Sequence, residues 1–219
     1  MRARYFAGGF SSFAEHEILE FLLFYSHRRL DTNKIAHRML REFGSLHNVF
    51  EADFNEISKK CKVTPNTALL VTLVPQFAAA YLKSKNGTGV TAFKNAADVA
   101  EYAAPLFIGC SDERLYVLCL DAKRRLISTS LIDEGTVDEV AVYPRKVAEA
   151  AIGYKASAVI LAHNHPSGSL APTRRDLETT EAIVNGLGFM RINVLDHVII
   201  AGDKHYSFAS RGQHVVGYV

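Results

Sequence analysis

The sequence predicts an α/β domain preceded by a small all-α unit. Up to about residue 83 the apolar residues recur with a helical period, whereas after LKSKNGTGVTAF (82–93) short strand-like runs alternate with helices. This polar, glycine-rich interval is the natural boundary between the two regions. We therefore place a helical domain at 1–86 and an α/β domain at 92–219.

In the first region, the apolar residues between 18 and 23 form one helical face. A second helix carries Ile35, Met39 and Leu40, could be capped by Asp31 or Thr32, and ends at Gly44. We expect two further helices, at about 53–60 with Asp53 and Glu56 in its first turn, and at about 66–83. Pro75 should kink or break the last one.

The second region opens with RLYVLCLD (114–121) and RLISTSLID (125–133), which alternate as strands do and form a predicted hairpin around 122–124. The remaining elements follow as an alternation of helix and strand. They are a helix from Pro144 to about Tyr154, a buried strand at 157–163, a helix from Thr173 to about Gly186 and a strand at 192–202.

Composition restricts the class of protein. The 219 residues are 48% apolar and 22% charged, as in ordinary globular domains. No apolar stretch approaches the ~20 residues of a membrane span and no signal peptide is evident, so we expect a cytoplasmic protein. The three cysteines form no CxxC pair, which argues against a disulfide framework or a thiolate zinc site. They should be inert core residues: Cys61, Cys110 and Cys119.

Two histidines stand one residue apart where the apolar run AVILAHNH ends. Side chains at i and i+2 share one face of a strand, so His163 and His165 should lie together, with Asn164 on the opposite face. Asp176 falls in the first turn of the next helix and can turn back toward them. Two histidines, one carboxylate and a position left for water are a ligand set of catalytic zinc.

Two other interpretations exist for this segment. Thr173 and Asp176 also have the form of a capping box, with Thr at the N-cap and an acid at N3. Capping explains Asp176 but leaves the two neighbouring histidines unexplained. The letters H-N-H alternatively suggest an HNH nuclease, although that motif spreads its residues over a ββα unit.

The spacing H-x-H, seven residues, Ser or Thr, two residues, Asp resembles the signature of the JAB/MPN (JAMM) metallopeptidase superfamily. HNHPSG, YPRKVAEAA (143–151), VLDHVIIAG and YSFASRG resemble the RadC branch in particular, over nearly the whole chain. The resemblance implies a mixed sheet flanked by helices and one zinc ion per chain, held by His163, His165 and Asp176. It also implies a glutamate that activates water.

Glu113 is the best candidate for that glutamate, because it directly precedes the strand at 114–121. Glu134 and Glu139 are rivals, and a solvated charge is the plain alternative for Glu113. Zinc lowers the pKa of bound water from about 15.7 toward 7, and a nearby carboxylate can accept the proton. Thr173, where the superfamily usually has Ser, is expected to donate its hydroxyl to the developing oxyanion.

Asp196 and His197 lie on the strand at 192–202 and also match a family motif. They could support the metal ligands from behind, but a satisfied polar pair in the core is the favoured interpretation. The other histidines have no partner at metal spacing.

In RadC-like proteins the N-terminal helices resemble a helix-hairpin-helix module, whose glycine-containing hairpin offers backbone N–H groups to a DNA phosphate. The corresponding stretch here, CKVTPNTA (61–68), has no glycine. The first 86 residues carry 12 Lys/Arg against 8 Asp/Glu, including Lys59, Lys60 and Lys62, which could supply salt-dependent contacts. A packing or partner-binding role is at least as well supported.

Two classes of function follow. The first is a zinc-dependent hydrolase acting on a peptide, isopeptide or related amide bond. The second is a DNA-associated or partner-binding accessory protein whose metal site is structural or vestigial. The RadC label itself carries an association with DNA repair, which the chemistry of these residues does not establish.

Overall fold

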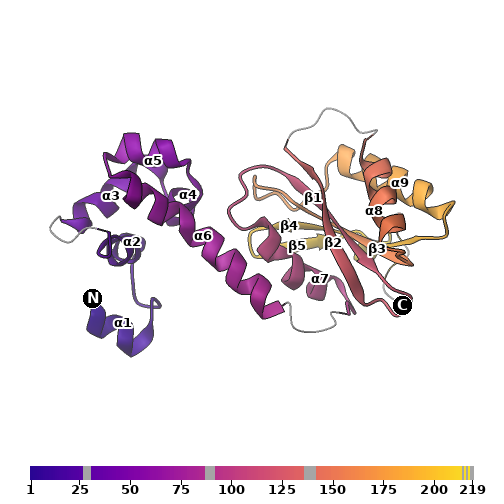
Figure 1. Ribbon diagram of the computed structural model, residues 1–219, viewed down its shortest axis with the longest axis horizontal. Coiled ribbons are helices and arrows are strands. Elements are labelled where there is room, and N and C mark those ends of the chain that lie inside the picture. Colours follow the sequence, from indigo (N-terminus) through magenta and orange to yellow (C-terminus); the bar gives the residue numbers. More distant parts are fainter. Residues whose placement is uncertain (27–30, 87–91, 136–141, 214, 216, 218–219) are drawn as a thin grey trace. The chain divides into compact units, whose positions relative to one another are not determined.

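The computed structural model describes residues 1–26, 31–86, 92–135 and 142–213, together with residues 215 and 217. Two compact units divide between Tyr81 and Leu82, and each is described by itself (Figure 1). This division lies within helix α6 (Pro65–Asn86), whose last residue is also the predicted end of the helical domain. None of the helices in the described part of the chain has the length and apolar composition that crossing a membrane requires.

All the regular secondary structure described in the N-terminal unit is helical. Its helices are α1 (Arg2–Gly8), α2 (Glu15–Leu23), α3 (Thr32–Phe43), α4 (Leu46–Glu51), α5 (Phe54–Cys61) and most of α6. Leu19, Leu23, Met39 and Ile57 are fully buried in its core, because the apolar faces of α2, α3 and α5 meet there.

The local signals in this unit act as expected at two helix ends. The Asp53 carboxylate caps α5 by accepting from the backbone N–H groups of Asn55 and Glu56, and Gly44 ends α3 with a φ of 88°. The alternative of a break at Pro75 is wrong, since α6 continues through it. A proline inside a helix removes one backbone hydrogen bond, and the turns on either side supply the others.

The predicted helix-hairpin-helix turn joins α5 to α6. Lys62 takes the left-handed conformation there, with φ and ψ both 49°, and its N–H donates to the Ser58 carbonyl. A lysine therefore occupies a backbone conformation that glycine adopts more easily. DNA contact through this turn stays a prediction.

The C-terminal unit is a five-stranded mixed sheet in the order β2-β1-β3-β4-β5. The strands are β1 (Arg114–Leu120), β2 (Leu126–Glu134), β3 (Ala158–Asn164), β4 (Asn193–Ala201) and β5 (Lys204–Ser207). Only β3 and β4 pair in parallel, while the β1–β2 hairpin and the other pairs are antiparallel. The predicted α/β class with a mixed sheet flanked by helices is confirmed.

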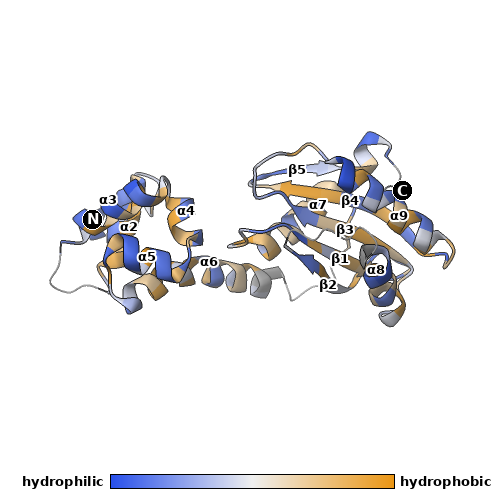
Figure 2. Cartoon of the chain, turned by 90° about the horizontal axis from the view of Figure 1, so that it is seen from above, coloured by the Kyte–Doolittle hydropathy of each residue, from blue (hydrophilic) through white to orange (hydrophobic). Residues whose placement is uncertain are grey.

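Helices cover both faces of the sheet. One face packs against α8 (Val142–Gly153) and α9 (Arg174–Gly188), and the other against α7 (Ala96–Ala103) and the short 3₁₀ helix η1 (Ala104–Phe107). β4, inside the sheet, is coloured hydrophobic in Figure 2, whereas the edge strand β5 is hydrophilic. Sequence analysis predicted neither α7 nor β5.

Alternation along β3 decides where the site lies. Val159 and Leu161 belong to the core under α8 and α9, whereas Ile160 and Ala162 belong to the core under α7. Continuing this period places His163 on the α8/α9 face and Asn164 on the α7 face. The three described cysteines are free and buried, as expected.

Candidate metal centre

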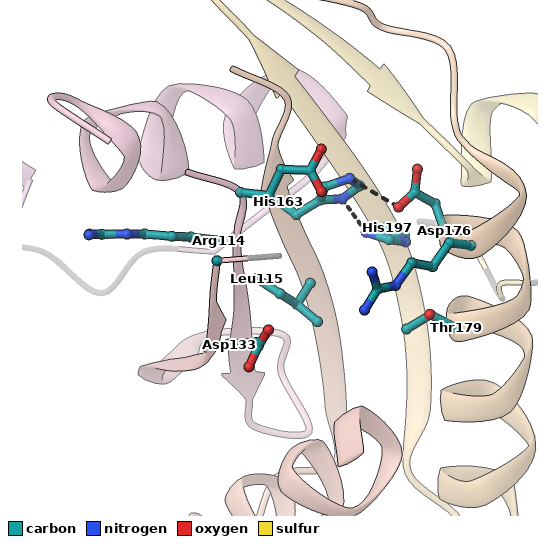
Figure 3. Close-up of a pocket in the computed structure, with 10 residues that line it drawn as sticks. Arg114, Leu115, Asp133, His163, Asp176, Thr179 and His197 are labelled. Atoms are coloured by element: carbon teal, nitrogen blue, oxygen red, sulfur yellow. Dashed lines mark hydrogen bonds and ion pairs between the residues drawn. The ribbon is translucent and has the colours of Figure 1, made fainter. Parts of the chain in front are cut away.

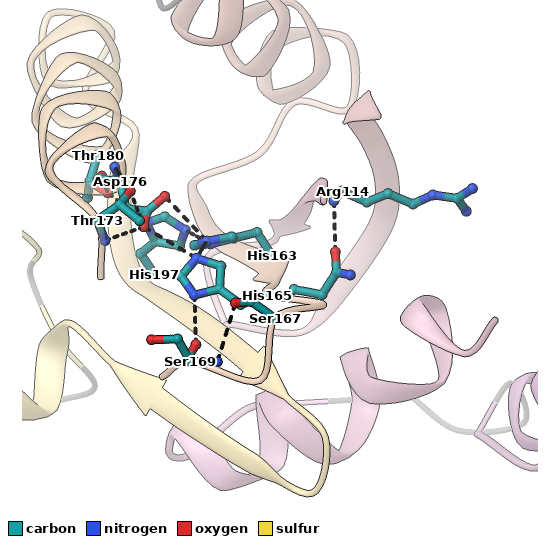
Figure 4. A network of polar contacts seen from close by, with 10 residues as sticks. Arg114, His163, His165, Ser167, Ser169, Thr173, Asp176, Thr180 and His197 are labelled. Carbon is teal, nitrogen blue, oxygen red and sulfur yellow. Dashed lines mark hydrogen bonds and ion pairs between the residues drawn. The ribbon is translucent and has the colours of Figure 1, made fainter. Parts of the chain in front are cut away.

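The three predicted metal ligands converge at the end of β3. Nε2 of His163 lies 2.8 Å from Nε2 of His165, and these atoms lie 3.3 and 3.4 Å from Oδ1 and Oδ2 of Asp176 (Figure 4). Donor atoms bound to one tetrahedral zinc at 2.0–2.1 Å are about 3.3 Å apart. The group can therefore hold a metal ion, and its ligand atoms all lie within 4.8 Å of one another.

The capping box and the ligand role of Asp176 coexist. Oδ2 accepts hydrogen bonds from the backbone N–H of Thr173 at 2.6 Å and from its hydroxyl at 2.7 Å. The Thr173 hydroxyl in turn accepts from the Asp176 N–H at 3.2 Å. The two interpretations of Asp176 are therefore compatible, because the cap orients the carboxylate toward the histidines.

A buried chain of hydrogen bonds fixes the protonation of His163. The Thr180 hydroxyl donates to the backbone carbonyl of Asp176 at 2.5 Å, so it must accept from Nδ1–H of His197 at 2.6 Å. Burial lowers the pKa of His197 well below its usual range, so this ring is neutral and its Nε2 accepts from Nδ1–H of His163 at 2.7 Å. Nε2 of His163 is therefore left with a lone pair.

His165 also carries its proton on Nδ1, but a different partner fixes it there. Its Nδ1 lies 2.8 Å from the Ser169 carbonyl, which can only accept, so this nitrogen carries a proton. In the neutral ring Nε2 then presents a lone pair toward that of His163. Two lone pairs 2.8 Å apart beside a carboxylate repel one another. A cation at their meeting point, either a proton or a metal ion, removes that repulsion.

The pKa values follow this electrostatic arrangement. Burial lowers the pKa of His163 to about 4. The hydrogen bond with Asp176 raises the pKa of His165, and the nearby charge of Glu113 contributes to the rise. Burial opposes ionisation of Asp176, but the hydrogen bond from His165, the charge of His163 and the Thr173 bonds bring its pKa well below its usual range. The carboxylate is thus ionised and the site attracts positive charge.

His197 lies behind His163, as in the less favoured of the two interpretations that the sequence left open. His197 is 2% exposed, and its ring contacts that of the predicted ligand His163 and stacks on Phe208 at 4.8 Å between ring centroids. The Asp196 carboxylate instead accepts from the backbone of His197 and Ala209 and from the Ser207 hydroxyl. The two residues are therefore not a side-chain pair, and Thr180, which completes the chain, was not identified at all.

A cavity of about 50 Å³ opens beside the ligands (Figure 3). His163, Asp176 and His197 line it together with Glu113, the exposed residue just before β1. Asp133 of β2 and Arg175 of α9 also line it, and no sequence signal marked them. Glu134 is not among the lining residues and pairs with the Arg114 guanidinium, while Glu139 lies outside the described residues. The exposed Thr173 is not among the residues that line the cavity either.

Comparison with known proteins agrees with this geometry. The RadC-like JAB domain matches residues 93–213. The chain belongs to the RadC family. It is 32% identical to a UPF0758 protein of Fusobacterium nucleatum over 218 residues, 97% of this chain and 94% of that protein. It is 38% identical to a UPF0758 protein of Herminiimonas arsenicoxydans over 175 residues, 80% of this chain and 78% of the relative. The match relates the C-terminal unit to the JAMM superfamily.

Proposed function

We propose that this RadC family protein is a zinc-dependent hydrolase of peptide, isopeptide or related amide bonds. The observation that carries the proposal is the pair of Nε2 lone pairs of His163 and His165, which meet beside the Asp176 carboxylate at the edge of a cavity. A structural zinc site usually closes with four protein ligands, whereas a catalytic site has three and an open position. Three ligands beside a cavity support the catalytic type.

The groups around the cavity have separate roles in the proposed reaction. Bound at this site, zinc supplies a Lewis acid that acidifies water and polarises a carbonyl. Glu113 lines the same cavity, and we assign its carboxylate the role of accepting a proton from the attacking water and passing it to the leaving amine. Glu113 is favoured over Glu134, because the latter pairs with Arg114.

Thr173 remains the proposed oxyanion donor, with a condition that the structure adds. Its hydroxyl hydrogen points to Oδ2 of Asp176 at 2.7 Å. To act on a substrate, that hydrogen has to rotate away from the carboxylate, which is easier once a metal ion has taken over part of the negative charge.

Metal analysis and peptide cleavage test this proposal together. Protein purified without added metal is analysed for zinc, and a defined mixture of synthetic peptides is incubated with it and read by mass spectrometry. We expect one zinc per chain and cleavage in the wild type, zinc without cleavage in Glu113→Gln, and neither in His163→Ala. Zinc content unchanged in His163→Ala removes the metal site.

The alternative accessory function gives a different pattern. It predicts salt-sensitive binding of the full chain to duplex DNA that Glu113→Gln leaves unchanged, together with zinc but no cleavage of any peptide by the wild type. Cleavage that disappears in Glu113→Gln excludes a purely accessory role for the C-terminal unit.

A further inference from the structure

The residue between the two histidine ligands holds the segment that carries Glu113. Asn164 is the last residue of β3, is 5% exposed, and faces away from the metal centre. Its Oδ1 accepts from the backbone N–H of Arg114 at 2.7 Å, and its Nδ2 donates to the backbone carbonyl of Asp112 at 3.1 Å. One side chain therefore binds the peptide groups on both sides of Glu113.

These two bonds belong to a wider fixation of the same short segment. The carbonyl of Glu113 accepts from the N–H of Gly135 at 2.9 Å, just after β2. Glu113 itself precedes the first residue of β1, and its own side chain is exposed and lines the cavity. The bonds from Gly135 and from the Asn164 side chain thus fix the backbone from which the Glu113 side chain extends.

The chemistry of the bonds requires an amide at this position. The Arg114 N–H needs an acceptor and the Asp112 carbonyl needs a donor, and asparagine offers one of each in a planar group. Aspartate has the same shape but turns an acceptor toward the Asp112 carbonyl. Alanine removes both partners and makes room for water.

We propose that Asn164 is a positioning residue that sets the location of Glu113 relative to the metal ligands. Because His163 and His165 flank it in sequence, one short segment of backbone carries both the ligands and the anchor of the base. Asn164 touches neither the metal ligands nor the cavity with its side chain in any described contact, so its effect passes through Glu113. The inference rests on the proposed function, in which Glu113 acts as general base.

Replacing Asn164 should change the position of Glu113 without changing metal binding. Replacing Asn164 should leave the ligand atoms on the opposite face of β3 in place, so metal stoichiometry is retained. Displacing a catalytic group by about 1 Å can cost about 10²-fold in rate. We therefore expect kcat for peptide cleavage to fall roughly 10²-fold in Asn164→Asp, with little change in KM.

Cobalt provides a readout that does not depend on cleavage. Protein loaded with Co²⁺ in place of zinc has a visible spectrum that changes with pH when water near the metal ionises. A neighbouring carboxylate shifts the pH at the midpoint of that spectral change. We expect Glu113→Gln to displace the midpoint and Asn164→Asp to displace it in the same direction, both with one cobalt per chain. Asn193→Asp, the same change at an exposed residue of β4, is the matched control and should match the wild type.

Asn164→Ala serves as the second variant if Asn164→Asp does not fold, because water can satisfy the two backbone groups. A wild-type midpoint and wild-type kcat in a folded Asn164 variant overturn the inference while the proposed function stands. Loss of cobalt from that variant also overturns it, since the residue then supports the ligands. If Glu113→Gln itself changes neither the midpoint nor cleavage, the assignment of the base fails and the inference fails with it.

Discussion

Thr180 gives the sharpest test of how the fold prepares the metal ligands. Its hydroxyl is buried, donates to the Asp176 carbonyl and accepts from Nδ1–H of His197. Thr180→Val preserves the shape and removes that acceptor. His197 can then carry its proton on Nε2 and donate to Nδ1 of His163, which moves the His163 proton to Nε2. In that tautomer His163 cannot bind a metal ion.

The magnitude follows from the hydrogen bond that is lost. Holding His197 in the metal-competent tautomer now leaves a buried N–H without a partner, at a cost of about 1–3 kcal/mol. At 1.4 kcal/mol per tenfold change, zinc affinity should fall about 5- to 150-fold. This range agrees with the roughly 10–100-fold effect of mutating outer partners of metal-bound histidines.

Competition with a chromophoric zinc chelator at neutral pH measures the affinity. Thr32→Val is the matched control, because it makes the same change at a buried threonine of α3, in the N-terminal unit. Proton–nitrogen correlation NMR of the histidine side chains reports the tautomer directly. A zinc affinity equal to that of the wild type, with His163 still protonated on Nδ1, would refute the reasoning about the chain.

Three further predictions address the ligands and the core. Zinc should raise the Tm more at pH 8 than at about pH 5.5, because a proton competes for His165, whose pKa is raised by Asp176 above the usual value of about 6.5. Without metal, stability should depend on pH in the opposite direction: the His165–Asp176 pair stabilises the fold below that usual value, and this stability is lost as pH rises through the raised pKa. Fluorimetric melting with and without zinc at each pH measures both pH dependences. An effect of zinc on the Tm that does not change with pH contradicts the first expectation. Leu161→Ala, at a fully buried position of the sheet, should destabilise the C-terminal unit by about 2–5 kcal/mol in urea unfolding, and a loss under about 1 kcal/mol speaks against that packing. Cys119, fully buried and with a pKa raised by burial to about 11, should not react with a thiol reagent in the native protein, whereas all three thiols should react in denaturant; native labelling at Cys119 counts against the core assignment.

Local patterns were sufficient to predict that His163, His165 and Asp176 lie together. The period of β3 places His163 and His165 on one face, and the first turn of α9 brings Asp176 back toward them over a short loop. Each of these steps uses only neighbouring residues. The same is true of the β1–β2 hairpin, whose turn is built by the Asp121 carboxylate accepting from the backbone N–H groups of Lys123 and Arg125.

Contacts that depend on strand order could not be predicted in this way. His197 reaches His163 only because β4 pairs in parallel with β3, and a register shift lies between Val159 and Ile160 along that pair. No spacing in the sequence encodes that meeting. Strand β5 was missed for a different reason: its four residues, KHYS, are mostly polar and carry no hydrophobic period.

Asp176 shows why the two interpretations of one motif need not compete. A helix N-terminus favours a carboxylate electrostatically, and the Thr173 cap fixes that carboxylate with two hydrogen bonds to Oδ2. Burial raises the pKa of Asp176, but the hydrogen bond from His165, the charge of His163 and then the two Thr173 bonds bring it well below its usual range, so the carboxylate is ionised before any metal arrives. A capping box that follows an H-x-H strand end is therefore a means of delivering a pre-oriented anionic ligand, and the structural role of the motif supports its chemical one.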